Sequence, residues 1–539
     1  MQDLEQGQQS HSGQRKRLRA ERRPLGCTAL AAADVVSAGD DGRLRTSSAL
    51  TCLALAPFAA SRYRKQRGVN LGSLFTLEPW LTPSLFEGVQ GAGSEYDLCK
   101  QLGEEQARRR LEKHWDTFID DGDWKWMKGH GINAVRLPLS YYHLLPGHPD
   151  QRVRALMKGT EYEAFAPIYQ NAFTYIQRTV EKAGQHGIGV LLDLHAAPGG
   201  QNGEGHSGLS NGKADFFTRP SNMKTTISIL QALVDTFASM DNVTGVELIN
   251  EPHDNGKLAD WYKEAIRHLR TACSAHAHLP LYLGDCWNTQ RYGEVVASHK
   301  GKAGPLVIDH HLYRCFTPQD HGKTAAQHAA EIQPGQNGPS YAFLATASSQ
   351  LNKGIVIGEW SAALNPASLR GSGRDQSQHQ RGWARAQLDA YNAQCAGHFF
   401  WTLKKEGSKD VGWCLYSAIE EDMLPAGLGR PRQGADVAFL EERGRQEGEN
   451  NYNGHVQYWA KNGGGKQMHH ERYRDGFTQV YRDCVDFYRA CGDEIGFTGQ
   501  WIQQRAHAYS EQHGSSDGEW EFVHGATKAV ECFLAALWT

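Results

Sequence analysis

Two apolar runs of this sequence end on carboxylates that a strand core would not need. Residues 246–253 read VELINEPH and stop on Asn250 and Glu251, and residues 354–360 read GIVIGEW and stop near Glu359. Burying a charged side chain is costly unless the strand end opens into a polar site. Two carboxyl groups held near each other cleave glycosidic bonds, one as acid/base and one as nucleophile. The pair therefore indicates chemistry on a sugar acetal.

The apolar runs that carry these residues recur along most of the chain. From Arg67 onward, short β-rich runs alternate with longer amphipathic stretches, the pattern of βαβ units in a parallel sheet. The expected strands are residues 67–73, 131–139, 187–195, 243–251, 279–287, 305–313, 354–360 and 397–404. Eight such units over residues 67–424 predict an α/β fold, a (β/α)8 TIM barrel. An open doubly wound sheet is disfavoured because RGVNLGSLF has no G-x-G-x-x-G fingerprint.

Seven of the eight expected strands end on polar or aromatic side chains. In a barrel, the carboxyl ends of the strands converge on one mouth, where active sites form. A purely structural core would not place so many such groups at one end. Besides Asn250, Glu251 and Glu359, these residues are Glu78, Trp80, Arg136, His195, His310, His311, Tyr313, Trp360 and Trp401.

Glu251 and Glu359 end the fourth and seventh expected strands, which face each other across the mouth. Retaining cleavage needs two carboxyl groups about 5–5.5 Å apart, a spacing that rigid strand ends can hold. The acid must keep its proton, which partial burial and a nearby carboxylate favour. The nucleophile must stay ionised, and Arg136 and Tyr313 are candidates for the donor that it needs.

Three segments fall outside the barrel repeat. Residues 1–66 contain eleven Lys or Arg and six Asp or Glu, typical of a disordered basic tail, with targeting or contact with a lipid surface as the alternative. Residues 425–465 predict a long mobile loop on the side of the mouth. Residues 466–539 have helical spacing, so we expect C-terminal helices packed against the barrel wall, or alternatively a separate binding module.

Composition limits the compartment and the partners. A net charge of −3 gives no support for a nucleic-acid binder. The eleven cysteines form no C-x-x-C pair and favour a reducing, cytoplasmic location over a disulfide framework. The expected partner is a carbohydrate or glucoside substrate. Peripheral membrane contact through the basic tail stays open, and the chain is expected to be a monomer.

The motifs LINEP and VIGEW, over a hundred residues apart, resemble the catalytic signature of glycoside hydrolase family 5, the clan A β-glycosidase barrels. The likeness extends from Arg67 to Leu424. More narrowly, GVNLGSLFTLEPWLTPSLFE, LDLHAAPGGQNG, DHHLY and FFWTLK resemble the fungal exo-β-1,3-glucanases, and the flanking segments resemble an intracellular, divergent branch. The resemblance implies a TIM barrel, a retaining mechanism and no cofactor.

The resemblance also implies a role for each matching residue. It makes Glu251 the acid/base and Glu359 the nucleophile, with Asn250 on the sugar 2-hydroxyl. The other implied contacts are Arg136 and Tyr313 at the nucleophile, His195 and His311 around the reacting sugar, Trp401 beneath its ring, and Glu78 on hydroxyls of the terminal glucose.

One stretch departs from the glucanase pattern. Where those enzymes carry an acid–amide pair that grips the glucose, this chain reads EGHSG, with Gly205 and His206 at the two positions. We therefore include His206 among the substrate-binding residues, as a replacement for a lost sugar ligand. No metal site is expected at Asp309-His310-His311, because neighbouring strand residues point to opposite faces.

Three functional hypotheses follow. The first is a retaining β-glucosidase acting on β-1,3-glucan ends, oligosaccharides or small β-glucosides. The second is a glucolipid β-glucosidase at a membrane surface, which the basic tail and the loop near the mouth would suit. The third is a non-catalytic carbohydrate-binding barrel. Trp80 and Trp360 are each expected to be either a sugar platform or a lid of the barrel rim.

Overall fold

The computed structural model describes residues 61–299, 304–370, 375–407, 409–430, 434–464 and 467–538. Residues 1–60 of the expected tail lie outside the described residues. For the end of that tail the prediction of disorder is wrong, because Lys65 is buried and Gln66 opens the first strand. The barrel therefore begins slightly earlier than predicted.

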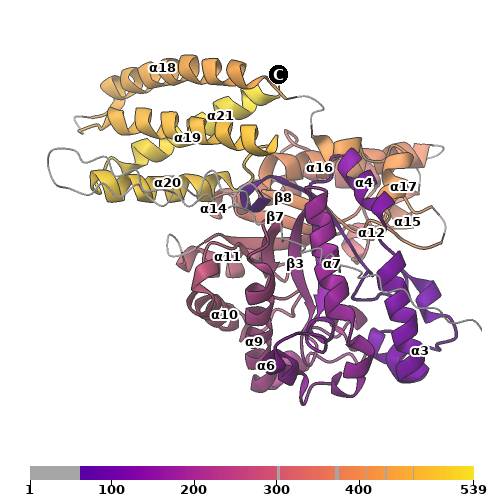
Figure 1. Cartoon of the computed structure of the whole chain (residues 1–539). Coiled ribbons are helices and arrows are strands. Elements are labelled where there is room, and N and C mark those ends of the chain that lie inside the picture. The colour runs from indigo at the N-terminus through magenta and orange to yellow at the C-terminus, as the bar shows by residue number, and fades with distance from the viewer. Residues whose placement is uncertain are drawn as a thin grey trace, which may run out of the picture. The chain divides into compact units, whose positions relative to one another are not determined.

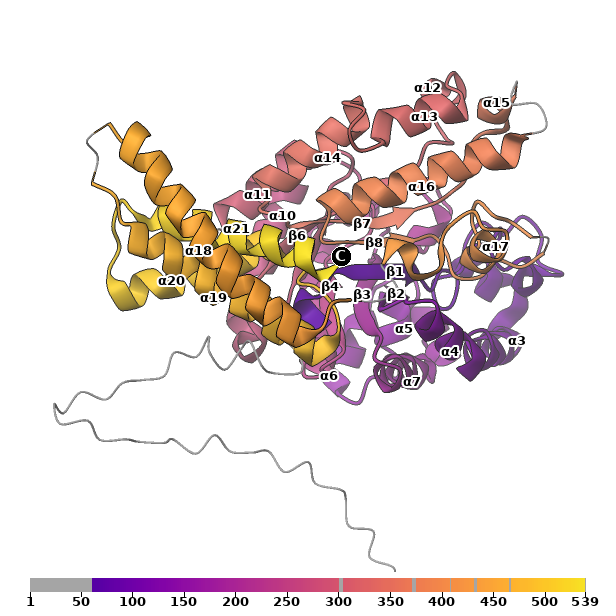
Figure 2. The ribbon, with the colours of Figure 1, turned by 90° about the horizontal axis from the view of Figure 1, so that it is seen from above.

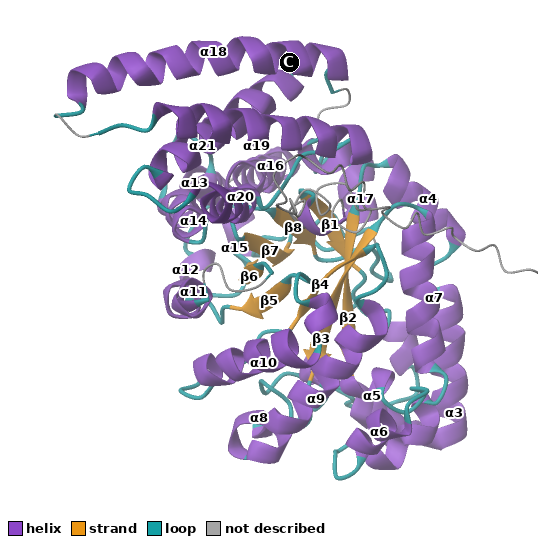
Figure 3. Ribbon diagram, turned by 60° about the vertical axis from the view of Figure 1, so that its left-hand side comes forward, coloured by secondary structure: helices purple, strands orange, loops and turns teal. Residues whose placement is uncertain are grey.

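Eight parallel strands close into a barrel (Figures 1 and 3). They are β1 (Gln66–Asn70), β2 (Ala134–Ser140), β3 (Gly189–Ala196), β4 (Val243–Glu247), β5 (Leu281–Gly284), β6 (Leu306–Leu312), β7 (Ile355–Trp360) and β8 (Gly397–Phe400). β1 pairs with β8 in a register that sets Gln66 opposite Gly397, which completes the ring. The prediction of a (β/α)8 TIM barrel is confirmed.

Helices surround the ring of strands (Figure 3). The α-helices up to residue 420 are α3 (Glu95–Thr117), α4 (Asp121–Gly129), α5 (Tyr141–Leu144), α6 (Gln151–Arg154), α7 (Ala172–Gln185), α8 (Asp215–Thr218), α9 (Pro220–Phe237), α10 (Leu258–Ala272), α11 (Thr289–Ser298), α12 (Pro318–His321), α13 (Ala325–Ile332), α14 (Pro339–Gln350), α15 (Pro366–Leu369), α16 (Gln376–Gln394) and α17 (Leu415–Glu420). The short 3-10 helices are η1 (Pro83–Phe86), η2 (Ala155–Met157), η3 (Glu163–Tyr169), η4 (Gly205–Ser207), η5 (Ser274–His276) and η7 (Ala426–Gly429).

Local sequence accounts for these elements. α3 begins after Ser94, whose side chain accepts the amide of Asp97 while Asp97 bonds back to Ser94, a capping box. Pro220 occupies the first position of α9, where its missing N–H would have no partner within the helix. β3 is buried along its whole length, as expected for a parallel sheet covered by helices.

Side chains fill the barrel interior in layers. Near the strand starts, the layer is largely apolar and consists of Ala134, Leu191, Tyr282, Val307, Val356 and Phe399. Two residues further along a strand, side chains point into the same interior. There β2, β3 and β6 carry Arg136, Asp193 and Asp309, all fully or almost fully buried. An apolar layer therefore supports a charged layer just below the mouth.

Four long helices follow the barrel and lie together (Figures 1 and 2). They are α18 (Val437–Asn462), α19 (His470–Cys491), α20 (Thr498–His513) and α21 (Glu519–Leu537). The prediction of a long loop over residues 425–465 is wrong. Most of that segment is α18, which packs Leu440 and His455 against its neighbours although its composition is polar. Tertiary packing overrides a weak helical pattern of this kind.

These helices close the barrel at its base, the end opposite the mouth, rather than along its wall. The Lys65 amide donates to the Glu494 carbonyl over 2.9 Å, and the Gly496 amide donates to the Tyr63 carbonyl over 2.7 Å. Arg67 in β1 binds Asp493 at 2.9 Å and Glu494 at 2.7 Å. Residues 493–496 thus seal the strand starts with backbone and charged contacts.

Two further properties concern the described residues alone. Among them, no helix is both long enough and apolar enough to cross a membrane. Their nine cysteines are all free thiols.

Replacing Arg67 with Met should destabilise the fold strongly. The side chain of Arg67 is 3% exposed, and its loss would remove the cation that pairs directly with two buried carboxylates. Breaking a buried ion pair in this way costs about 3–5 kcal/mol in the free energy of unfolding. The midpoint of thermal unfolding measures the effect. Arg109→Met is the matched control, because Arg109 pairs with Glu105 on the surface, and it should change the free energy by less than about 1 kcal/mol. Equal midpoints for the two variants would contradict the prediction.

Candidate active site

Arg136 is the centre of the site. It lies in β2 with no exposed surface. Its Nη1 donates to Glu359 Oε1 over 2.9 Å and to Asn70 Oδ1 over 3.1 Å. Its Nη2 donates to Asn250 Oδ1 over 2.7 Å, and Nε donates to Glu247 Oε2 over 2.8 Å. A planar guanidinium holds several acceptors at fixed angles, so Arg136 sets the positions of groups from other strands.

Three buried acids around Arg136 were missed by sequence reasoning. Asp193 Oδ2 lies 3.1 Å from its Nη2 and Asp309 Oδ2 lies 3.6 Å from its Nε, beside the Glu247 contact. The sequence contains a pattern that could have revealed two of these acids, Asp193 and Asp309. Asp193 and Asp309 each precede a site histidine by two residues, and that spacing puts both side chains on one strand face.

The surroundings of Arg136 also shift the pKa of one of these acids, Glu247. Burial raises the pKa of Glu247 well above its ordinary value, and the charges of Asp309 and Asp193 add to this effect although Arg136 opposes it. Gly358 leaves room for Asp309, because a Cβ at Gly358 would lie 2.0 Å from Asp309 Oδ1.

Glu251 lies in a turn beyond β4. The expected strand 243–251 ends at Glu247, and Glu251 has a φ of +40°. This left-handed conformation costs a residue with a side chain about 1–3 kcal/mol and recurs at functional sites. Asn202 Nδ2 donates to the Glu251 carbonyl over 2.9 Å and so holds the turn. The turn directs the Glu251 carboxylate toward β6.

The two glutamates meet at His311. One carboxylate oxygen of each glutamate and a ring nitrogen of His311 all lie within 4.8 Å of one another. His311 Nδ1 is 2.7 Å from Glu251 Oε1 and 3.5 Å from Glu359 Oε2. Tyr313 donates its hydroxyl to Glu359 Oε2 over 2.9 Å. Both oxygens of Glu359 therefore have fixed donors, one from Tyr313 and the other from Arg136.

Glu251, His311 and Glu359 shift one another's pKa values. Burial raises the pKa of Glu251, but the hydrogen bond and charge of His311, with the charge of His206, outweigh it and lower the pKa to about 2. Burial lowers the pKa of His311, yet Glu359, Asp309 and Glu251 raise it well above its ordinary value. Burial raises the pKa of Glu359, against His311 and Arg136. These shifts favour a proton on His311 over one on Glu251, whereas the sequence led us to expect a protonated Glu251.

The remaining predicted residues line the same mouth. His195 Nδ1 is 2.6 Å from Asp193 Oδ2, and its Nε2 is 3.3 Å from Asn250 Nδ2. The Trp401 ring lies parallel to the His195 ring with centroids 6.0 Å apart. His206, in the 3-10 helix η4, has Nδ1 3.3 Å from His195 Nε2 and Nε2 3.8 Å from Glu251 Oε2. The EGHSG departure thus brings an imidazole beside the acid.

Glu78 and Trp80 form the rim on the side of β1. Trp80 Nε1 donates to Glu78 Oε2 over 2.8 Å, and its ring is 40% exposed. Burial raises the pKa of Glu78 to about 7, against the charge of His206 and the Trp80 hydrogen bond and with help from Glu359 and Glu251. Those charges place Glu78 beside the other predicted groups, so all ten predicted site residues gather at one mouth.

Trp360 is neither a platform nor a lid. It has no exposed surface and packs its ring against Tyr391, His398 and Phe400 at centroid distances of 5.3, 5.5 and 5.2 Å. Side chains alternate along β7, so the residue after an inward-facing Glu359 points outward into the helix layer. Trp360 is a core residue.

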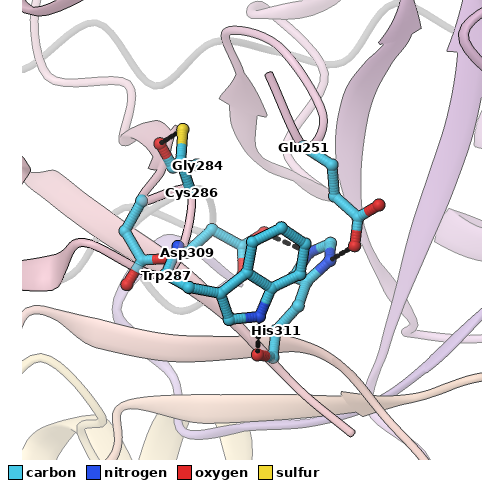
Figure 4. Close-up of a pocket in the computed structure, with 7 residues that line it drawn as sticks. Glu251, Gly284, Cys286, Trp287, Asp309 and His311 are labelled. Atoms are coloured by element: carbon cyan, nitrogen blue, oxygen red, sulfur yellow. Dashed lines mark hydrogen bonds and ion pairs between the residues drawn. The ribbon is translucent and has the colours of Figure 1, made fainter. Parts of the chain in front are cut away.

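A small open pocket adjoins Glu251, and one of its walls is Trp287, which sequence reasoning did not single out (Figure 4). Trp287, with a φ of +58° and 59% exposure, presents its ring there and donates Nε1 to the His311 carbonyl over 2.9 Å. The lining residues are Glu251, Gly284, Asp285, Cys286, Trp287, Asp309 and His311. The pocket therefore places an exposed indole beside the carboxylate of Glu251.

The side chains of His310 and His311 have different partners, as strand alternation predicts. His310 Nδ1 is 2.8 Å from Asp285 Oδ2, whereas His311 faces the glutamates. Two sets of donors here are close enough to hold a cation, namely Glu247, Asp309 and His311, and Glu251, His311 and Glu359. Both sets already contact the permanent charge of Arg136, which would oppose a second cation.

A closed eight-stranded barrel with an acid pair at its mouth and an indole beside it defines a glycoside hydrolase. Comparison with known families is more specific. Residues 99–407 match the family described as Cellulase (glycosyl hydrolase family 5), and residues 440–537 match the Glucan 1,3-beta-glucosidase 3 C-terminal domain. The chain belongs to glycosyl hydrolase family 5.

Named relatives agree with this assignment. Glucan 1,3-beta-glucosidase 3 of Schizosaccharomyces pombe is 32% identical over 473 residues, which cover 87% of this chain and 94% of the relative. A probable glucan 1,3-beta-glucosidase A of Emericella nidulans is 30% identical and covers 70% of this chain and 94% of its own length. The crystal structure of a rutinosidase from Aspergillus niger shares the fold, with a TM-score of 0.52 and 19% identity over 68% of this chain and 99% of that one.

Titration of Glu78 should be visible in the pH dependence of stability. Its folded pKa of about 7 exceeds its ordinary value of 4.5, so between these pH values the folded state binds more protons than the unfolded state. Stability therefore falls as pH rises through this window. Relative to wild type, Glu78→Gln should become more stable as pH rises from about 4.5 to about 7, with little further change above.

Thermal unfolding midpoints between about pH 4.5 and 8 measure this difference. Glu87→Gln is the matched control, since Glu87 is an exposed glutamate of the same loop and should leave the curve parallel to wild type. A parallel curve for Glu78→Gln as well would show that Glu78 titrates at its ordinary pKa.

Proposed function

We propose that this β-glycoside hydrolase is a retaining β-glucosidase that acts on β-1,3-glucan ends, oligosaccharides or small β-glucosides, with Glu359 as nucleophile and Glu251 as acid/base. The observation that carries the proposal is the close approach of the two carboxylates, whose oxygens lie within 4.8 Å of each other around His311. Retaining enzymes hold these groups about 5–5.5 Å apart, whereas inverting enzymes need about 6.5–9.5 Å to admit a water.

In the first step, a Glu359 oxygen attacks the anomeric carbon and the bond to the leaving oxygen breaks. The proton that His311 shares with Glu251 over 2.7 Å passes through Glu251 to the leaving oxygen. Arg136 and Tyr313 each donate a hydrogen bond to one oxygen of Glu359, so the nucleophile is already oriented for attack. The product of this step is a glycosyl ester of Glu359 and a free aglycone.

In the second step, Glu251 acts as the base and Glu359 is released from the ester. Glu251, again a carboxylate, takes a proton from water and returns it to the hydrogen bond with His311, and the oxygen of that water attacks the anomeric carbon. The ester bond breaks, Glu359 returns as a carboxylate and the sugar leaves with the anomeric configuration of the substrate. Asn250 is held by Arg136 and lies beside His195, a position suited to the sugar 2-hydroxyl.

Glucose as the sugar and a β-1,3-linked partner are supported by the relatives, two of which are named as glucan 1,3-beta-glucosidases. A membrane-surface role receives less support than the sequence suggested. The segment expected to form a loop near the mouth is largely α18, which packs on α19 and α21.

The mechanism is tested by comparing Glu359→Ala and Glu251→Gln with wild type on an aryl β-glucoside, a β-1,3-glucan oligosaccharide and a ceramide glucoside. Wild type should release glucose first as its β anomer, followed by NMR, and Glu359→Ala should release none. Glu251→Gln should lose about 10²–10⁴-fold in rate on substrates whose leaving group needs a proton.

A substrate with an activated leaving group separates the two roles. A dinitrophenyl β-glucoside needs no proton donor, so Glu251→Gln should still form the glycosyl ester, and added azide should accelerate its turnover and yield a β-glucosyl azide. Glu359→Ala should gain no β-azide product. Release of the α anomer first by wild type would contradict the retaining mechanism.

Trp287→Ala should reveal which side of the site holds the aglycone. Removing an exposed indole from the pocket beside Glu251 should lower kcat/KM for an aryl β-glucoside about tenfold, or about 1.4 kcal/mol, and barely affect β-glucosyl fluoride. Trp80→Ala is the matched control, because Trp80 contacts Glu78 on the sugar side and should affect both substrates equally. Equal losses on both substrates for Trp287→Ala would contradict the assignment.

A further inference from the structure

A second cluster of titratable side chains lies in the C-terminal helices, away from the barrel mouth. It joins three helices, with His455 on α18, His470 at the start of α19 and Glu521 on α21. One ligand atom of each residue lies within 4.8 Å of the others. The glycosidase mechanism uses none of these groups.

The geometry of the cluster converges on one oxygen. His455 Nε2 is 2.8 Å from Glu521 Oε2, and His470 Nδ1 is 3.3 Å from the same oxygen. The other oxygen of Glu521 accepts the His469 amide over 2.6 Å, which fixes the carboxylate. Two imidazoles and one carboxylate therefore face a common point with the carboxylate already oriented.

Burial and missing partners distinguish this cluster from an ordinary ion pair. The side chains of His455 and Glu521 are only 2% and 1% exposed, whereas His470 is 25% exposed and opens the cluster to solvent. Within the described residues, Nδ1 of His470 is buried and has no hydrogen-bond partner, although a carboxylate oxygen lies nearby. A buried nitrogen without a proton partner is available for a metal.

The fourth side of the cluster also carries an imidazole. His524 lies three residues after Glu521 on α21, so the two side chains share a helix face. Its ring centroid is 5.5 Å from that of His455. His524 is exposed and lies beside the three clustered groups without being one of them, so a fourth ligand position would be left to water.

We propose that His455, His470 and Glu521 bind a divalent transition metal of the zinc type that ties α18, α19 and α21 together. Imidazole nitrogens with a carboxylate oxygen suit such a metal, and zinc holds them at about 2.0–2.2 Å. Ligand atoms around a tetrahedral zinc then lie about 3.3–3.5 Å apart. The His470–Glu521 distance of 3.3 Å already fits, and the His455–Glu521 distance of 2.8 Å must open slightly.

The test uses the full chain after treatment with a chelator and dialysis. Zinc should bind with one equivalent at this site and raise the midpoint of thermal unfolding by about 2 °C or more, because it binds the folded state selectively. Magnesium should give no shift, since it prefers oxygen ligands. His470→Gln should lose one zinc equivalent and the shift. His507→Gln, an exposed histidine of α20, should retain both.

Zinc held by the glutamates of the barrel mouth would behave differently. It would inhibit hydrolysis, and both its inhibition and its contribution to unfolding would persist in His470→Gln. The proposal is overturned if zinc leaves the wild-type midpoint unchanged, or if the shift and stoichiometry are the same in His470→Gln as in wild type.

Discussion

The buried guanidinium of Arg136 must be balanced inside the barrel, and the active site is built on that requirement. Its guanidinium contacts Asp193, Glu247, Asp309 and Glu359 from four different strands. Removing charges from water is expensive, so each group must be paired, hydrogen-bonded or neutralised. Burial raises the pKa of Glu247, and Glu359 is held by Arg136 and Tyr313. The nucleophile candidate is thereby positioned by the same forces that make the interior stable.

The same layer governs where protons reside at the mouth. Asp309 and the two site glutamates raise the pKa of His311, and the charged imidazole in turn lowers the pKa of Glu251. The raised pKa of His311 suits it to hold a proton in contact with the acid candidate, Glu251. A bound sugar that excludes water would favour proton transfer along the His311–Glu251 hydrogen bond. The imidazole of His206 is a second ring beside Glu251, with its Nε2 3.8 Å from Glu251 Oε2.

The C-terminal helices support the site from the opposite end. They seal the strand starts through Arg67, Asp493 and Glu494, and their core is continuous with the lower interior layer of the barrel. Rigid strand starts help to fix the strand ends, because a closed barrel transmits displacements around its ring. Residues 440–537 match the C-terminal domain described for Glucan 1,3-beta-glucosidase 3, and the relative of that name aligns with 87% of this chain, so barrel and helices occur together in that relative as well.

The sequence by itself determined the eight strands, the closed barrel and the gathering of ten polar or aromatic residues at one mouth, because strand alternation and parallel order act locally and leave a periodic trace. Only the tertiary structure decided which acids surround Arg136, that Trp360 points outward and that a turn carries Glu251. It also decided that α18 is helical and that the pKa of His311 is raised. These depend on contacts between residues far apart in the chain. Burial and charge balance arise only when the strands are brought together, so no local pattern records them.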